Sequence, residues 1–223
     1  MQATDFLRIL GTVDAVLAEA GNAGLPESLT YNSHIHLPPN FSAFETDEQA
    51  VEIAAGEGVQ VLGCGNYYDY SVYRGFAETA RDQGVFPLFG TEIIALETDL
   101  QEQGIRVNDP GNPGKYYICG KGISRFEELS PRADQLLSGI RTNDTLRMRE
   151  MTEKMAGVFS DHGIDTGLDD KAVIQRVVTR HGCSADIVTL QERHLAQAFQ
   201  EIFFEKVPVD QRTKKLADLF GDS

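Results

Sequence analysis

The most constraining feature of the sequence is an alternation of strand-like and helix-like segments between residues 29 and 94. Compact runs of β-branched and aromatic residues predict strands at residues 29–37, 59–63 and 85–94. Apolar residues at helical spacing predict a helix in each of the two intervals, over about residues 47–55 and 72–80. Strands and helices that alternate with short connections are typical of parallel βαβ units. Three strands cannot close a barrel, so we expect an open α/β sheet or part of a larger one.

Local signals set the expected ends of these elements. Thr46 and Gln49 have the spacing of a capping box, and Ser71 can cap the helix that follows it. Before the first strand, apolar residues at three- and four-residue steps predict one amphipathic helix from about residue 6, closed near Gly21. After the third strand, a stretch dense in turn formers precedes residues 115–120, which we interpret as a β-hairpin excursion.

Beyond residue 123 the pattern becomes helical throughout. Ser130 followed by proline is a typical helix start, and helical spacing continues to about residue 159. A second helix is expected over about 169–180, and a capping box from Thr189 to Glu192 predicts a third through residue 203. We therefore expect two domains, an α/β domain over residues 1–123 and an all-α domain over residues 124–223.

The composition limits which cellular compartment and which binding partners are expected. No apolar run approaches the ~20 residues of a membrane span, the first residues lack the basic region of a secretory signal, and three widely spaced cysteines match no metal pattern. We therefore expect a cytoplasmic protein. Residues 1–123 carry 6 basic and 17 acidic side chains, and the whole chain has a net charge of −14, which argues against nucleic-acid binding. Neither the oligomeric state nor a substrate follows from composition.

Candidate ligands for a metal ion lie at the ends of the predicted strands. His34 and His36 alternate along the first strand, so both imidazoles project from one face; either they form a divalent-metal site or they are a chance pair on a solvated strand. Glu92, between apolar neighbours in the third strand, either has a partner such as a metal or faces solvent. Asn66 and Asp69 follow the second strand and are weaker candidates, and Asp69 suits a loop before the helix better than a metal site.

The spacing of His34, His36 and Glu92, over roughly residues 30–97, resembles the PHP (polymerase and histidinol phosphatase) superfamily. This resemblance implies a partial or distorted (β/α)7 TIM-like barrel, with divalent ions such as zinc, manganese or iron held by these residues. It also implies hydrolysis of a small phosphorylated substrate, with Glu92 able to bridge two ions.

The helical half is similar to an all-α insertion that follows the third motif in one branch of the superfamily. By that resemblance Arg141, Arg147 and Arg149 orient a substrate phosphate, although charges at helical spacing are also typical of a solvated face. His194 likewise faces either the site or solvent. Substrate-binding roles for Arg141, Arg147 and His194 are therefore expectations that rest on the resemblance.

The sequence also departs from the family pattern. Where the family has Thr-Asp-His after the second strand, this chain has Gly65-Asn66-Tyr67, so an expected imidazole is replaced by a phenol. Further family ligands, a later histidine and a closing Asp-x-His, do not occur before Ser223. We therefore expect either the amino-terminal portion of a longer phosphoesterase or a degenerate site. The second alternative is a binding or regulatory module without catalysis, and a third is an interaction scaffold built on the helical half.

Overall fold

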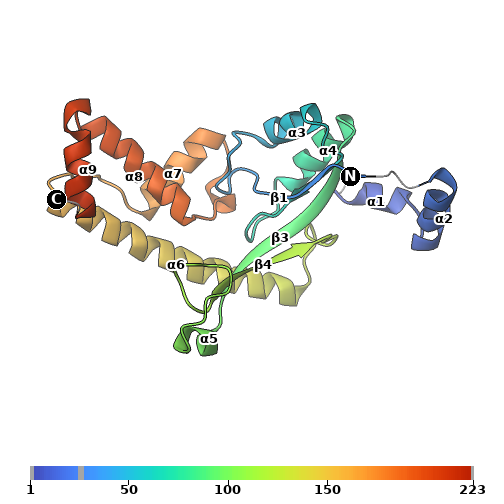
Figure 1. The fold of residues 1–223 in the computed structure, drawn as a ribbon, viewed down its shortest axis with the longest axis horizontal. Helices are drawn as coiled ribbons and strands as arrows, with labels where there is room; N and C mark the ends of the chain where they lie inside the picture. The colour runs from blue at the N-terminus through green and yellow to red at the C-terminus, as the bar shows by residue number, and fades with distance from the viewer. Residues whose placement is uncertain (1–2, 25–27, 222–223) are drawn as a thin grey trace. The chain divides into compact units, whose positions relative to one another are not determined.

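The computed structural model describes residues 3–24 and 28–221, and its central element is a four-stranded sheet in the order β1-β2-β3-β4 (Figure 1). Strands β1 to β3 run parallel to one another, and β4 pairs antiparallel with β3. The strands are β1 (Tyr31–Ile35), β2 (Val61–Cys64), β3 (Phe86–Leu96) and β4 (Lys115–Lys121). The predicted strands and hairpin are present, in a mixed α/β arrangement.

Two helices connect the parallel strands. Helix α3 (Asp47–Gly56) joins β1 to β2, and α4 (Tyr73–Asp82) joins β2 to β3, as the alternation predicted. The two helices pack on each other, and α4 also contacts β3. Aromatic rings fill the core beneath them: the Phe89 ring lies within 6.3 Å of the rings of Phe76 and Tyr73. This packing fixes the carboxyl ends of β2 and β3, where candidate ligands lie.

The amino-terminal segment corrects one prediction. Two helices, α1 (Asp5–Ile9) and α2 (Val13–Ala23), replace the single helix expected there. Gly11 between them has a φ of +81°, a conformation that ends a helix and that glycine adopts without steric cost. Thr12 then caps α2 by accepting a hydrogen bond from the Ala15 N–H.

The start of α3 agrees with its prediction and the start of α4 does not. Thr46 Oγ1 accepts from the Gln49 N–H at 3.1 Å, which caps α3 as expected. Helix α4, however, begins after Val72 without a side-chain cap. Ser71 instead donates its backbone N–H to Asp69 Oδ1 at 2.9 Å, because the chain makes a tight turn there before the helix starts.

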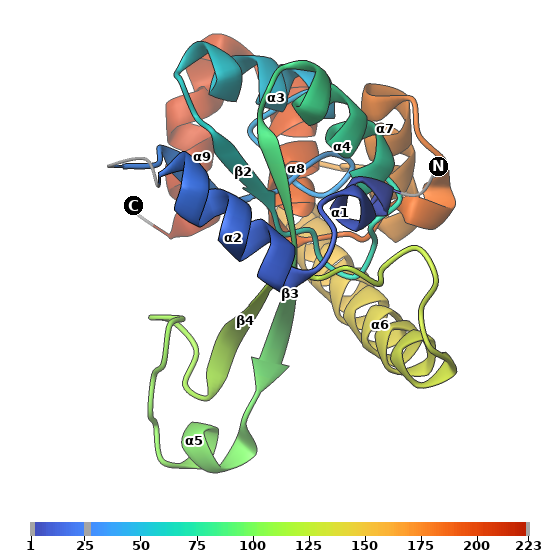
Figure 2. The ribbon, with the colours of Figure 1, turned by 90° about the vertical axis from the view of Figure 1, so that its right-hand side faces the viewer.

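The β3–β4 hairpin carries a short helix, α5 (Thr98–Glu102), that the turn-rich sequence did not predict. Figure 2 shows α5 at the end of the hairpin, in the connection between the two strands. The register of the hairpin is regular from Gly90, opposite Lys121, to Leu96, opposite Lys115. This register places Lys121 of β4 opposite Gly90, two residues before Glu92 in β3.

The described residues divide into two compact units. One unit comprises Met1–Pro38 and Ser42–Ala133 and contains the sheet; the other comprises Pro39–Phe41 and Asp134–Ser223. The predicted domain boundary at residue 123 stays a prediction. Regular structure after that residue is helical in the described part: α6 (Pro131–Asp161), α7 (Asp170–His181), η1 (Ala185–Ile187), α8 (Glu192–Lys206), η2 (Val209–Gln211) and α9 (Arg212–Phe220). No helix among the described residues is long and apolar enough to cross a membrane.

The helical unit has its own core. Met148 of α6, Val173 and Val177 of α7, and Leu195 and Phe199 of α8 are almost fully buried in one cluster. This is the helical spacing that the sequence showed, so the three long helices were predicted in the right places.

The capping box of α8 lies two residues later than predicted. Gln191, not Thr189, is the N-cap, and its N–H donates to Nδ1 of His194 at 3.1 Å. Glu192, the expected partner of Thr189, is the first residue of the helix.

Candidate metal centre

Two histidines at the end of β1 bring their imidazoles together. The register of β1 with β2 shifts between Asn32 and Ile35, and the His34 N–H donates to Asn32 Oδ1 at 3.0 Å in this irregular stretch. The rings of His34 and His36 lie 5.0 Å apart, with their Nε2 atoms separated by 3.3 Å. Nδ1 of His36 is buried and has no hydrogen-bond partner among the described residues. Such unsatisfied buried groups call for an explanation, and an ordered water is one of the usual ones.

Glu92 of β3 supplies the third group, and its residue surface is only 6% exposed. Its Oε2 lies 2.8 Å from Nε2 of His34 and 3.2 Å from Nε2 of His36. Burial opposes ionisation of this carboxyl, but hydrogen bonds from both histidines and from Tyr67 outweigh it and hold the pKa of Glu92 well below its ordinary value. Glu92 is therefore a buried carboxylate whose negative charge is stabilised by hydrogen bonds from its neighbours.

The three atoms have the spacing of ligands around a metal ion. At metal–ligand distances of about 2.0–2.1 Å, adjacent ligand atoms lie about 2.9 Å apart in an octahedron and about 3.3 Å apart in a tetrahedron. The three edges of the triangle are 2.8, 3.2 and 3.3 Å. His34, His36 and Glu92 also form a three-residue group able to hold a metal among the described residues. The donor set, two imidazoles and a carboxylate, suits zinc, manganese or iron.

Hydrogen bonding alone does not account for all three contacts. Two neutral imidazoles bring at most two Nε2 protons, and Oε2 of Glu92 attracts both. The contact between the two Nε2 atoms, at 3.3 Å, then has no proton along it. A cation at the centre of the triangle satisfies all three atoms at once, so the residues present fit a divalent ion.

Tyr67 packs against this triangle. Its hydroxyl donates to Oε1 of Glu92 at 2.8 Å, and its ring stacks on His36 at 4.9 Å between centroids. Burial and the neighbouring Glu92 raise the pKa of Tyr67 far above its ordinary value, so the phenol keeps its proton. The position where the resemblance expects an imidazole thus holds a hydrogen-bond donor to the carboxylate.

Lys121, at the end of β4, contacts Nδ1 of His34, the ring nitrogen that is not part of the triangle. Its Nζ donates to the Ser33 carbonyl at 2.6 Å and lies 2.9 Å from Nδ1 of His34. An ammonium can only donate, so this contact places the proton of a neutral His34 on Nε2. Binding of a cation at that Nε2 therefore requires Lys121 to release Nδ1 and to keep only its bond to Ser33. Sequence reasoning missed Lys121, because the hairpin was predicted without its register.

A glycine makes room for the His34 ring. A Cβ added at Gly65 would lie 3.1 Å from Cε1 and 3.3 Å from Nδ1 of His34, closer than side chains ordinarily approach. The imidazole therefore lies directly over the backbone that leaves β2. Glycine at this position lets His34 reach Glu92.

Asn66 and Asp69 have other roles in the structure. Asn66 is 1% exposed, and its amide holds the backbone of Leu37 at both ends: Oδ1 accepts from the Leu37 N–H at 2.8 Å, and Nδ2 donates to the Leu37 carbonyl at 2.9 Å. Asp69 accepts from the Ser71 N–H and is not part of the potential metal group found among the described residues. We interpret Asn66 as a clamp on the segment that follows β1, and Asp69 as a turn residue.

Within the helical unit, the positive charge of Arg147 is balanced by two carboxylates. Its guanidinium donates to Asp144 at 2.7 Å and to Glu192 at 2.6 Å. These two carboxylates raise the pKa of Arg147 against the opposing effect of burial. Arg147 therefore ties α6 to the start of α8, which is a structural role.

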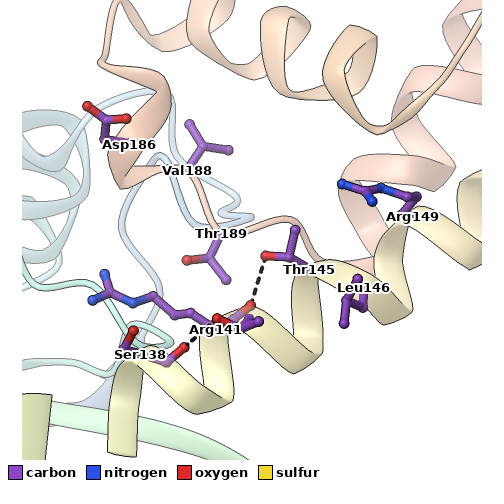
Figure 3. A pocket seen from close by; sticks show the side chains of 9 residues that line it. Ser138, Arg141, Thr145, Leu146, Arg149, Asp186, Val188 and Thr189 are labelled. Atoms are coloured by element: carbon purple, nitrogen blue, oxygen red, sulfur yellow. Dashed lines mark hydrogen bonds between the residues drawn. The ribbon is translucent and has the colours of Figure 1, made fainter. Parts of the chain in front are cut away.

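Arg141 lines a pocket of about 430 Å³ on α6 (Figure 3). Figure 3 shows Arg141 and Arg149 at opposite ends of this pocket, and they are separated by about 12 Å of helix rise. Nε of Arg149 donates to Asp170 at 3.1 Å, and Asp186 also lines the pocket. Arg149 is thus paired with Asp170, and the carboxylate of Asp186 offsets part of the positive charge in this pocket.

His194 is a buried structural residue of the helical unit and does not face solvent. It is 3% exposed, accepts from the Gln191 N–H through Nδ1, and packs its ring against Phe41 at 5.4 Å. Burial, with a smaller contribution from His181, lowers the pKa of His194 to about 4. It is therefore neutral at physiological pH, and its Nδ1 serves as a hydrogen-bond acceptor in the capping box.

Comparison with solved structures shows a likeness of fold. No family model and no curated protein matches the sequence. A solved structure from Bifidobacterium adolescentis, of a protein for which a metal-dependent phosphoesterase function has been inferred, matches the fold with a TM-score of 0.58 and 15% sequence identity. The match covers 87% of this chain and 56% of that chain. The chain thus has the fold of a little over half of that protein.

Proposed function

We propose that the chain carries the metal site of a PHP-type phosphoesterase, built on a partial (β/α)7 barrel. The observation that carries this proposal is the triangle of Nε2 of His34, Nε2 of His36 and Oε2 of Glu92, whose edges of 2.8–3.3 Å match the spacing of metal ligands. The fold likeness to an inferred metal-dependent phosphoesterase supports the same assignment. A cytoplasmic location is part of the proposal.

Each group at the site has a task in this reaction class. His34, His36 and Glu92 bind the ion, and Tyr67 orients the carboxylate through Oε1. A bound divalent ion lowers the pKa of a coordinated water and neutralises phosphate oxygens. Lys121 lies 2.9 Å from the His34 ring, so its positive charge is available to an anionic substrate beside the cluster.

The substrate proposed is a small phosphate ester. The acidic surface of residues 1–123 repels a polyanion such as nucleic acid, whereas a single phosphate can be matched by one ion and one lysine. Arg141 remains a candidate for contact with a substrate anion, because it lines a pocket of its own unit.

Metal retention and hydrolysis test the proposal separately. Untagged protein is loaded with Zn²⁺ or Mn²⁺, dialysed, and assayed for bound metal and for hydrolysis of p-nitrophenyl phosphate. The variant His36→Gln should lose roughly 100-fold or more in metal affinity, together with any hydrolysis, since it lacks a direct ligand. His162→Gln is the matched control, because His162 bonds to the Val158 carbonyl and is not part of the cluster. Equal metal retention by both variants would refute the site.

The alternative is a binding or regulatory module with a retained metal site and no turnover. Its motivation is Tyr67, which replaces an expected ligand and donates to Glu92 instead. This alternative predicts that loaded protein binds inorganic phosphate, that His36→Gln abolishes this binding, and that no ester is hydrolysed. Hydrolysis that disappears in His36→Gln would eliminate it.

A further inference from the structure

Tyr67 determines whether Glu92 can bridge two ions in the candidate metal centre. A carboxylate that bridges two ions with one oxygen on each needs both of its oxygens open to metal. Oε2 of Glu92 faces the two histidines, but Oε1 accepts the Tyr67 hydroxyl at 2.8 Å. One of the two oxygens is therefore committed to a hydrogen bond.

The backbone fixes Tyr67 in this position. Tyr67 and Glu92 form a parallel bridge just beyond β2, with the Glu92 N–H donating to the Asn66 carbonyl at 3.3 Å. The next residue, Tyr68, has a φ of +54°, a conformation that only a few per cent of non-glycine residues adopt. Its hydroxyl accepts from the Ile94 N–H at 3.3 Å, on the strand that carries Glu92. The segment after β2 is thus held against β3 on both sides of the phenol.

The geometry of the phenol strengthens this assignment, because its hydroxyl is directed at Oε1 of Glu92. The ring also stacks on His36, with 4.9 Å between the centroids, so the phenol contacts two of the three proposed ligands.

We propose that Tyr67 restricts the His34/His36/Glu92 cluster to a single divalent ion by holding Glu92 as a terminal, non-bridging ligand. This inference rests on the metal site proposed above and goes beyond it, because that site could equally hold a bridged pair. It makes Tyr67 a positioning residue, which acts on the ion through Glu92.

The number of ions and their magnetic coupling test this inference without an activity assay. Untagged full chain is titrated with Mn²⁺ by equilibrium dialysis and examined by electron paramagnetic resonance. We expect one ion per chain with the hyperfine pattern of an isolated Mn²⁺ ion. Two spin-coupled ions in the unchanged protein would overturn the inference while leaving the proposed metal site intact. No bound ion at all would overturn both.

Two variants test the part played by Tyr67. Tyr67→His frees Oε1 and adds an imidazole, so it should bind a second ion and show the spectrum of a coupled pair; continued binding of one ion would overturn the role assigned to Tyr67. Tyr67→Phe removes only the hydroxyl and should retain one ion with roughly 10- to 100-fold weaker affinity. Tyr70→Phe is the matched control, because Tyr70 bonds to Thr91 and should leave the affinity unchanged. Equal affinities of the two phenylalanine variants would also refute the assignment.

Discussion

Replacing His194 with glutamine should remove a specific acid sensitivity of the helical unit. The pKa of His194 falls from 6.5 to about 4 in the folded chain, chiefly because the ring is buried. Between these values the unfolded chain binds a proton that the folded chain does not, so stability is lost as the pH falls from 6.5 to 4. Each pH unit removes up to about 1.4 kcal/mol, and the whole fall removes about 3 kcal/mol.

Glutamine is the matched substitution at this position. It is a standard capping-box residue three positions after an N-cap, so it can accept from the Gln191 N–H as the imidazole does, and it does not titrate. The assay is urea unfolding followed by far-ultraviolet circular dichroism, at several pH values from 7.5 to 4.5, on both proteins. The difference between them isolates His194 from other groups.

One such group is Asp47. Burial and the neighbouring Glu48 raise its pKa to about 6. Its folded form binds the extra proton, so its contribution to stability rises as the pH falls, opposite in sign to that of His194. Asp47 is present in both proteins and cancels in their difference. If wild type and His194→Gln lose the same free energy of unfolding between pH 7.5 and 4.5, the reasoning about His194 is wrong.

Three further substitutions probe the candidate site. Lys121→Met removes a cation 2.9 Å from His34 and should tighten Zn²⁺ binding roughly tenfold, measured by calorimetry; weaker binding would contradict the competition described above. Gly65→Ala pushes on the same ring and should weaken Zn²⁺ binding roughly tenfold, because ligand positions tolerate only about 0.2 Å; unchanged affinity would show that the ring adapts. Asn66→Ala leaves the buried N–H and carbonyl of Leu37 without their partner and should lower the free energy of unfolding by about 2–4 kcal/mol in urea titrations; a loss well below 1 kcal/mol would contradict the clamp.

The elements that the sequence predicted are those specified by local patterns. Strands β1 to β3 and helices α3 and α4 follow from short apolar runs and helical spacing, and both signals are complete within each segment. The metal candidates followed from the same reasoning, because parallel strands place their carboxyl ends at one edge. His34, His36 and Glu92 do converge, although the first strand ends at Ile35, one residue before the second histidine.

The error at the start of α8 arises where distant contacts choose between local alternatives. Thr189 and Gln191 both precede α8, and threonine is the better intrinsic cap. In the structure Oε1 of Gln191 accepts from the Phe41 N–H, and its Nε2 donates to Asn40 at 3.2 Å, contacts that span about 150 positions in the chain. The helix start is thus fixed by tertiary bonds that no local pattern contains.

Tyr67 shows why a site cannot be read from residue types alone. In the sequence it is a missing imidazole, which favours a degenerate site. In the structure its hydroxyl lies 2.8 Å from Oε1 of Glu92, so on the proposed site it is a group that orients a ligand. A phenol can coordinate, donate or merely pack, and its distance and direction to the carboxylate decide which. Because that geometry depends on the turn at Tyr68 and the bridge to β3, the replacement changes the number of ions expected and need not abolish binding.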